Sequence, residues 1–169
     1  KESAPIRPNN VYSYHKLICE KMIQCYQESY GLEYIILRLF NVYGKGVKGV
    51  FDRLVAASKN GEIFRAFGIS QYRDFVWTGD IADAFYQAAV SDKAVNKIIN
   101  IGSGKGTQIR SVMEMIKEVV PNAEWVEIKS NTPIFDSIAD VTKARLLLGY
   151  EPHTSHDFML KVIREEICQ

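Results

Sequence analysis

Tyr12 and Lys16 stand four residues apart near the beginning of the chain, in the run Val11-Tyr-Ser-Tyr-His-Lys-Leu-Ile-Cys-Glu20. On a helix, residues four apart lie one turn above each other on the same face. A lysine ammonium beside a phenol favours the phenolate and lowers the pKa of the tyrosine. The spacing therefore predicts that Tyr12 acts as a general acid or base near neutral pH.

A second interpretation of this pair is an ordinary contact between an aromatic and a basic side chain on one helix. The chain has nine tyrosines, so a lysine four residues after one of them arises readily by chance. The other elements and motifs of the chain decide between the two interpretations.

The composition bounds the class of protein. The 169 residues are 47% hydrophobic and 24% charged, as in a globular protein of about one domain. Twenty-one basic and twenty acidic residues almost cancel, so we expect no nucleic acid or anionic lipid partner. No apolar run approaches the ~20 residues of a membrane span, and we expect no membrane association. Three cysteines without metal-type spacing predict free thiols in a reducing, cytoplasmic compartment.

The first half of the chain alternates helix and strand. Apolar residues at three- and four-residue steps predict a helix over residues 11–30, with Asn10 as its N-cap and Gly31 as its stop. Residues 34–40 form an apolar, β-branched run typical of a parallel strand that is buried on both faces. The loop of residues 41–46 follows that strand, and a short helix is expected from residue 49 or 50 to residue 58.

The second half continues the pattern and predicts an α/β fold. Residues 63–67 and 72–77 are expected to be two strands around a turn. Asp80, Thr107 and Asp140 are expected N-caps of helices over residues 81–90, 109–120 and 141–148. Further predicted elements are strands over 97–101 and 123–129, a last helix over 156–167, and a buried helix side formed by Ala82, Phe85, Ala88 and Ala89.

Two other motifs could bind phosphate. Gly102-Ser-Gly-Lys-Gly-Thr107 has neither the spacing of a phosphate-binding loop nor that of the dinucleotide fingerprint, so we interpret it as a structural strand-to-helix turn. Arg73 could hold a diphosphate with its guanidinium fork, or it could form a surface pair with Asp74. The three histidines have no metal-ligand spacing and are interpreted as structural.

Six motifs in the same order resemble the nucleotide-sugar epimerase/dehydratase branch of the extended short-chain dehydrogenase/reductase family. They are Tyr12-Ser-Tyr-His-Lys-Leu-Ile-Cys-Glu20, Leu37-Arg-Leu-Phe-Asn-Val-Tyr-Gly44, Gly49-Val-Phe51, Gln71-Tyr-Arg-Asp-Phe-Val-Trp-Thr-Gly-Asp80, Asn100-Ile-Gly-Ser-Gly104, and Ala139-Asp-Val-Thr-Lys-Ala144 with Leu148-Gly-Tyr-Glu-Pro152. The resemblance implies the C-terminal part of a Rossmann-type fold with a small mixed α/β substrate-binding lobe. Residues 11–62 would belong to the Rossmann domain and residues 63–169 mainly to the lobe.

The resemblance also implies roles for single residues. Tyr12 matches the catalytic acid/base, and Lys16 matches the lysine that holds the nicotinamide ribose and lowers the tyrosine pKa. Phe40 and Asn41 match the segment that faces the nicotinamide and the sugar nucleotide. Two further matches are Val50, near the nucleotide base, and Arg73, on the substrate diphosphate.

Some positions depart from the family pattern. His15 stands where the family usually has Ser, and Lys45 replaces a common proline. The loop of residues 130–136 lacks the arginine that many members use as a second phosphate contact, which weakens the case for a UDP-sugar. The glycine-rich dinucleotide fingerprint and the Ser or Thr that usually completes the tyrosine site are not found in the chain.

The chain begins with a polar, proline-containing segment and has no initiator Met, so we expect a fragment of a longer protein. The complete protein would be an NAD- or NADP-dependent nucleotide-sugar epimerase, dehydratase or reductase, and this chain alone is expected to be inactive and to bind no cofactor tightly. The alternative is a non-catalytic module for substrate binding or dimerisation. From the family resemblance we also expect a homodimer formed through the helices of residues 11–30 and 50–60.

Overall fold

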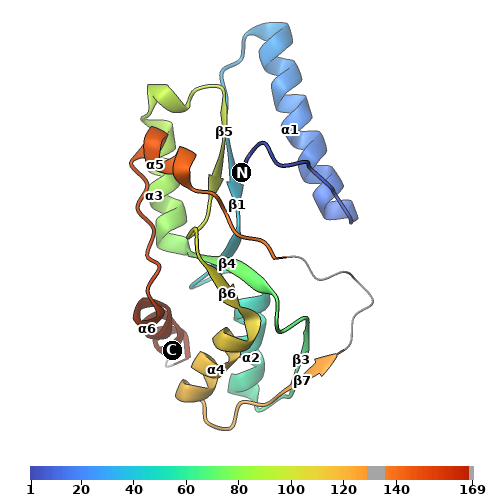
Figure 1. Cartoon of the computed structure of the whole chain (residues 1–169), viewed down its shortest axis with the longest axis vertical. Helices are drawn as coiled ribbons and strands as arrows, with labels where there is room; N and C mark the ends of the chain where they lie inside the picture. The colour runs from blue at the N-terminus through green and yellow to red at the C-terminus, as the bar shows by residue number, and fades with distance from the viewer. Residues whose placement is uncertain (129–135, 168–169) are drawn as a thin grey trace.

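The computed structural model describes residues 1–128 and 136–167, and the side chains of residues 50 and 166–167 lie outside the description. The predicted strand end at residue 129, most of the loop of residues 130–136 and Cys168 therefore fall outside the described residues. The fold is α/β with parallel strand pairs, as the alternating pattern predicted (Figure 1). Within the described chain, no helix combines the length and apolar character needed to cross a bilayer.

Helix α1 (Val11–Tyr30) confirms the predicted boundaries. The Asn10 side chain accepts a hydrogen bond from the Ser13 N–H, and the Ser13 hydroxyl is 3.1 Å from the Asn10 N–H, which completes a capping box. Gly31 ends the helix in the left-handed conformation, with φ of 70°, which favours glycine. No residue of α1 is buried, because the helix stands beside the rest of the chain on one side only (Figure 1).

Strands β1 (Ile35–Leu39) and β5 (Lys97–Ile101) form a parallel pair in the register Leu37 opposite Ile99. The prediction that β1 is buried on both faces was wrong. Ile36 alone is buried in this strand, and Leu39 is 41% exposed. In the described chain β1 pairs only with β5, so one edge of β1 has no neighbouring strand. Helix α1 stands on the β1 side of this strand pair (Figure 1).

Strand β4 (Tyr72–Trp77) lies at the centre of a second sheet. It pairs in parallel with β2 (Asn41–Tyr43) and antiparallel with β6 (Gly106–Gln108). A third sheet pairs β3 (Phe64–Phe67) in parallel with β7 (Trp125–Ile128). The predicted strands around the turn of residues 68–71 exist, but they do not pair with each other, because β2 and β6 occupy both edges of β4.

The helices other than α1 divide between two apolar clusters. Helices α2 (Val50–Asn60), α4 (Ile109–Val119) and α6 (His156–Ile167) pack together with β3 in the lower part of Figure 1. Helices α3 (Thr78–Ala89) and α5 (Thr142–Leu148), with the 3₁₀ turn η1 (Asp92–Ala94), cover β5 in the upper part. The division of the chain into a Rossmann portion and a lobe stays a prediction.

Three helices have N-cap residues other than those predicted. Helix α3 begins at Thr78, so Asp80 lies in its first turn, buried at 2% exposure. Helix α4 begins at Ile109 as predicted, but Thr107 belongs to β6 opposite Arg73, so the N-cap residue is Gln108. Asp140 accepts a hydrogen bond from the Thr142 N–H at 3.0 Å, but it precedes the N-cap of α5 by one residue.

The buried side of α3 was also predicted wrongly, except for Ala88. The residues that face the core are Ile81, Ala84 and Ala88, whereas Phe85 is 53% exposed and Ala82 and Ala89 are also exposed. The small side chains of Ala84 and Ala88 let the helix lie close to β5, and the large Phe85 is turned outward.

Candidate active site

A cleft of about 740 Å³ lies at the carboxyl end of β1 and beside the first turn of α1. It brings together Tyr12, Phe40 and Asn41, three of the residues singled out from the sequence. The rest of the lining comes from the chain start, from β1 and β5, and from the segment before α5: Lys1, Ala4, Pro5, Ile6, Arg38, Leu39, Asn100, Asp136, Ser137 and Ile138. Ligands bind at carboxyl ends of strands in open α/β sheets, so this cleft is the candidate active site.

Tyr12 and Lys16 have the geometry that their spacing predicted. The Lys16 Nζ lies 5.4 Å from the centroid of the Tyr12 ring, over its face. Tyr12 is 71% exposed and lines the cleft, while Lys16 is not among the residues that line it. The capped first turn of α1 therefore presents a phenol to the cleft with a cation directly behind it.

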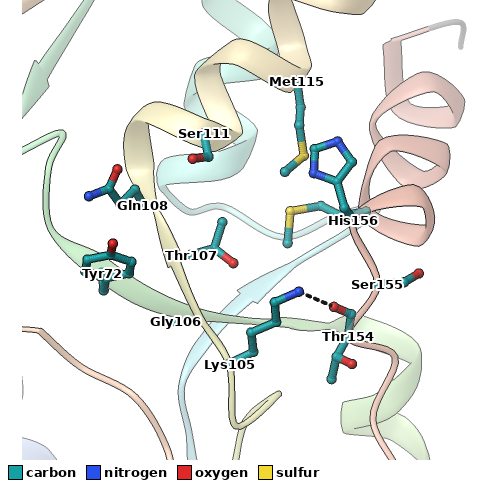
Figure 2. Close-up of a pocket in the computed structure, with 11 residues that line it drawn as sticks. Tyr72, Lys105, Gly106, Thr107, Gln108, Ser111, Met115, Thr154, Ser155 and His156 are labelled. Atoms are coloured by element: carbon teal, nitrogen blue, oxygen red, sulfur yellow. Dashed lines mark hydrogen bonds between the residues drawn. The ribbon is translucent and has the colours of Figure 1, made fainter.

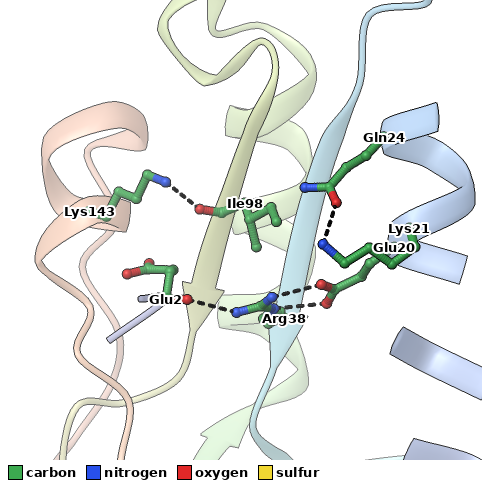
Figure 3. Close-up of polar contacts among 7 residues, drawn as sticks. All are labelled: Glu2, Glu20, Lys21, Gln24, Arg38, Ile98 and Lys143. Atoms are coloured by element: carbon green, nitrogen blue, oxygen red, sulfur yellow. Dashed lines mark hydrogen bonds and ion pairs between the residues drawn. The ribbon is translucent and has the colours of Figure 1, made fainter. Parts of the chain in front are cut away.

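An ion pair joins α1 to the sheet below the cleft. Arg38 of β1 donates from Nε and Nη2 to the two carboxylate oxygens of Glu20, at 2.8 and 2.7 Å (Figure 3). A third donor, Arg38 Nη1, reaches the backbone carbonyl of Glu2 at 3.2 Å. The hydrogen bonds that Arg38 donates to Glu20 raise the pKa of Arg38, so the guanidinium remains charged.

Glu2 holds the chain start to β5. Its side-chain carboxylate accepts a hydrogen bond from the Asn100 N–H at 2.9 Å. The segment that precedes α1 is thereby attached to both strands of the sheet, β1 through Arg38 and β5 through Asn100. This attachment explains why residues 1–6 contribute one wall of the cleft.

Asn41 is oriented by β4. Its Nδ2 donates to the backbone carbonyl of Asp74 at 3.2 Å, in the register where Asn41 stands opposite Phe75. The amide nitrogen is thus engaged, and the Asn41 Oδ1 has no hydrogen-bond donor within the described residues. The side chain can offer this oxygen to a hydroxyl group of a ligand.

Asp74 is the polar residue that sequence reasoning misjudged. It was weighed as half of a surface pair with Arg73, but it is fully buried. Its carboxylate accepts hydrogen bonds from the Ser103 N–H at 2.6 Å, the Ser103 hydroxyl at 2.7 Å, the Gly104 N–H at 2.9 Å and the Ala139 N–H at 3.0 Å. A carboxylate within an aromatic strand was the signal in the sequence that could have indicated such a role.

The glycine-rich run after β5 is a structural turn in this fold. The N–H groups of Ser103 and Gly104, which a phosphate-binding loop would direct at a phosphate, are donated to Asp74. A Cβ on Gly102 would lie 2.7 Å from both the Asp74 Oδ2 and the Ala139 Cβ, so this position requires glycine. The carboxylate thus joins β4, the turn after β5 and the segment that leads to α5.

Arg73 is not among the described residues that line the cleft. The Arg73 guanidinium hydrogen-bonds to the side chain of Gln71, and its Nη1 donates to the Tyr72 carbonyl at 3.3 Å. Burial lowers the pKa of Arg73, and the charge of Asp136 opposes this shift. Val50 begins α2, and its side chain lies outside the described residues.

Asp80 forms a second buried carboxylate site that sequence reasoning did not find. It accepts a hydrogen bond from the His153 N–H at 2.9 Å, and its Oδ1 is 2.7 Å from the His153 Nδ1. The imidazole also stacks on Phe158, with ring centroids 4.3 Å apart. Among the described residues, no group of three or more His, Cys, Asp or Glu side chains is arranged to hold a metal.

Comparison of the chain with known proteins identifies the family to which it belongs. The model of the NAD dependent epimerase/dehydratase family matches residues 1–102, which is more than half of the chain. The chain therefore belongs to the NAD dependent epimerase/dehydratase family.

Two curated relatives are named UDP-glucose 4-epimerases. The putative enzyme of Methanocaldococcus jannaschii is 35% identical over 159 residues, covering 89% of this chain and 51% of that protein. The enzyme of Halalkalibacterium halodurans is 32% identical over 176 residues, covering 90% of this chain and 52% of that protein. The chain thus spans about half the length of the curated relatives it matches.

Solved structures show the same fold. The UDP-glucuronic acid 4-epimerase from Bacillus cereus, in complex with UDP-glucuronic acid and NAD, has a TM-score of 0.90 at 27% identity, covering 100% of this chain and 56% of that chain. The UDP-glucose 4-epimerase from Thermotoga maritima, with UDP-glucose, has a TM-score of 0.81 at 30% identity, covering 94% of this chain and 53% of that chain.

Proposed function

We propose that this chain is the acid/base helix and substrate-binding lobe of an NAD(P)-dependent nucleotide-sugar epimerase or dehydratase. The observation that carries the proposal is that Tyr12, Phe40 and Asn41 line one cleft, with Lys16 against the Tyr12 ring. The similarity to 4-epimerases that bind UDP-sugars and NAD supports it.

In this proposal Tyr12 takes the proton from a sugar hydroxyl, and returns it after the sugar has been oxidised and reduced again. Bound nicotinamide would supply the acceptor for the hydride that leaves the carbon bearing this hydroxyl. Lys16 would hold the nicotinamide ribose and favour the phenolate of Tyr12 through its charge. Exposure of Tyr12 to the cleft supports this role, since a general base must reach the proton that it removes.

The remaining predicted site residues would hold the substrate. Phe40 and Asn41 would face the nicotinamide and the sugar, with the Asn41 Oδ1 as an acceptor for a sugar hydroxyl. Arg73 would contact the diphosphate after turning away from Gln71, and Val50 would pack near the nucleotide base. Free Cys19 and Cys25 fit the reducing, cytoplasmic compartment expected from the sequence.

The fit to a dinucleotide is partial. Lys16 and the open cleft suit the nicotinamide end, whereas the 169 residues contain no dinucleotide fingerprint for the pyrophosphate, and the N–H groups of the glycine-rich turn after β5 are donated to Asp74. We therefore propose that this chain alone binds NAD weakly and is inactive. Calorimetric titration with NAD is the measurement, and a dissociation constant in the micromolar range would refute this part of the proposal.

Binding of nucleotide sugars tests the proposed lobe directly. Amide shifts of the chain are followed by NMR during titration with UDP-glucose and with dTDP-glucose. We expect saturable shifts at Phe40, Asn41 and Arg73, and weaker binding in the Asn41→Ala variant. A variant of an exposed asparagine away from the cleft, Asn60→Ala, should bind like the parent chain. Absence of saturable binding for both sugars would overturn the proposal.

The second candidate is a non-catalytic module that binds substrate or dimerises. The observation that favours it is the apolar surface of α1, of which no residue is buried. The exposed apolar residues of this helix are Val11, Tyr12, Tyr14, Ile18, Met22, Ile23, Tyr26 and Tyr30. Patches of this kind usually mark an interaction surface. We propose that a second copy of the chain covers it, as the family resemblance implies.

A further inference from the structure

A second cavity, separate from the candidate active site, lies between β6, α4 and the beginning of α6 (Figure 2). Its volume is about 230 Å³, below the size of pockets that take drug-sized ligands, so it suits a small molecule. Among the described residues, none lines both this cavity and the cleft that contains Tyr12. The cavity is lined by Tyr72, Lys105, Gly106, Thr107, Gln108, Ser111, Met115, Thr154, Ser155, His156 and Met159.

Among the described residues, the charged side chains that line this cavity are basic. Lys105 contributes a cation, and its Nζ donates to the Thr154 carbonyl at 3.3 Å, which holds the side chain at the cavity (Figure 2). His156 contributes an imidazole, and no carboxylate is among the described residues that line the cavity. A concave site with a cation and without acidic groups attracts anions.

The hydroxyl groups supply further donors. Within the described residues, the side chains of Tyr72, Thr107 and Ser111 make no hydrogen bond, although all three line the cavity. They are therefore available to a bound group, and each hydroxyl donates one hydrogen bond. The buried side chains of Met115 and Met159 add an apolar part to this lining.

We propose that this cavity binds a small phosphate-bearing molecule, with Lys105 and the hydroxyls of Thr107 and Ser111 around the phosphate. Phosphate presents several acceptor oxygens to a cation and to hydroxyl donors at the same time, and such charge-assisted hydrogen bonds are the strong ones. The helices α4 and α6 also begin at this cavity, which adds to the positive potential there. This site does not depend on the proposed enzymatic function.

The test is an amide-shift titration of the complete 169-residue chain with inorganic phosphate at constant ionic strength. We expect saturable shifts at Thr107, Gln108 and Ser111. Lys105→Gln and the isosteric Thr107→Val should each raise the dissociation constant about five-fold, the loss of roughly one hydrogen bond. The exposed Lys97, on β5, provides the matched control Lys97→Gln, which should bind phosphate like the parent chain.

Two results would overturn the proposal. One is a set of shifts that never saturates, or that persists unchanged in both Lys105→Gln and Thr107→Val. The other comes from a parallel titration with UDP: amides of the cavity that respond to UDP but not to inorganic phosphate would assign the cavity to the nucleotide-sugar site. Shifts caused by inorganic phosphate at Thr107 and Ser111, with UDP acting at Phe40 and Asn41, support a separate site.

Discussion

Arg38 on β1 and Glu20 on α1 are joined by two hydrogen bonds between charged groups, at 2.8 and 2.7 Å. Both side chains are largely shielded from solvent, with exposures of 23% and 17%. Since α1 buries none of its residues, this pair is a principal attachment of the helix that carries Tyr12. The position of Tyr12 at the cleft therefore depends on a contact two turns further along the same helix.

Glu20→Gln should loosen α1 from the sheet. Removing the charge weakens a charge-assisted pair, and we expect the loss of about 1–3 kcal/mol in the local opening free energy of the helix. Hydrogen exchange of the α1 amides measures this loss, while the amides of α4 should exchange as before. Glu28→Gln, at an exposed position of the same helix, is the control. Equal exchange in the two variants would contradict the role of the ion pair.

Asp74→Asn should destabilise the whole fold. The carboxylate accepts four hydrogen bonds at a fully buried position, and an amide nitrogen would face donors that it cannot accept from. Leaving buried N–H groups without acceptors costs about 2–4 kcal/mol in the free energy of unfolding. Urea denaturation measures this cost, with the exposed Asp83→Asn as the control that should leave the midpoint unchanged. A midpoint for Asp74→Asn equal to that of the parent chain would show that the turn after β5 does not need the charge.

The stability of the chain should fall in alkaline solution. Burial raises the pKa of Tyr43 and Tyr150 in the folded chain, well above the value of about 10 expected in the unfolded chain. Below about pH 10 both states keep these protons, so the stabilisation is complete. Above about pH 10 the unfolded chain loses the protons and the folded chain retains them, so the free energy of unfolding decreases as pH rises.

The measurement is the urea midpoint between pH 8 and pH 11, compared among tyrosine variants. Above about pH 10, the free energy of unfolding of Tyr43→Phe should decrease with pH less steeply than that of the parent chain, by about 1.4 kcal/mol per pH unit. Tyr30→Phe, at a tyrosine that is 78% exposed, should keep the slope of the parent chain. If the stability of Tyr43→Phe fell with pH as steeply as that of the parent chain, Tyr43 would not contribute to the alkaline loss of stability.

The exposed face of α1 should cause self-association. We expect light scattering to give the mass of a dimer for the chain, because uncovered apolar surface finds a partner. Ile18→Glu with Met22→Glu places charges on this face and should give a monomer. Leu146→Glu changes an apolar residue that is 73% exposed on α5, and it should remain dimeric. A parent chain that is monomeric at all concentrations would rule out this interface.

Sequence reasoning succeeded where the signals are local. The bounds of α1 and β5 are those predicted, and α2 and α6 begin at the predicted residues, because caps, stops and apolar periodicity act within a few residues. The strands predicted over residues 63–67 and 72–77 exist, but each strand takes its partners from distant parts of the chain. Local turn chemistry does not determine such a choice.

For the candidate site, the geometry of Tyr12 and Lys16 was determined by the sequence alone. Asn10 and Gly31 set the ends of one helix, and a spacing of four then places the two side chains together. Tertiary structure alone decided that Phe40 and Asn41 join Tyr12 in a cleft while Arg73 does not, and that Asp74 and Asp80 are buried. The hydrogen-bond donors of these two carboxylates lie between 29 and 73 residues away, so only the assembled fold brings each charge to its partners.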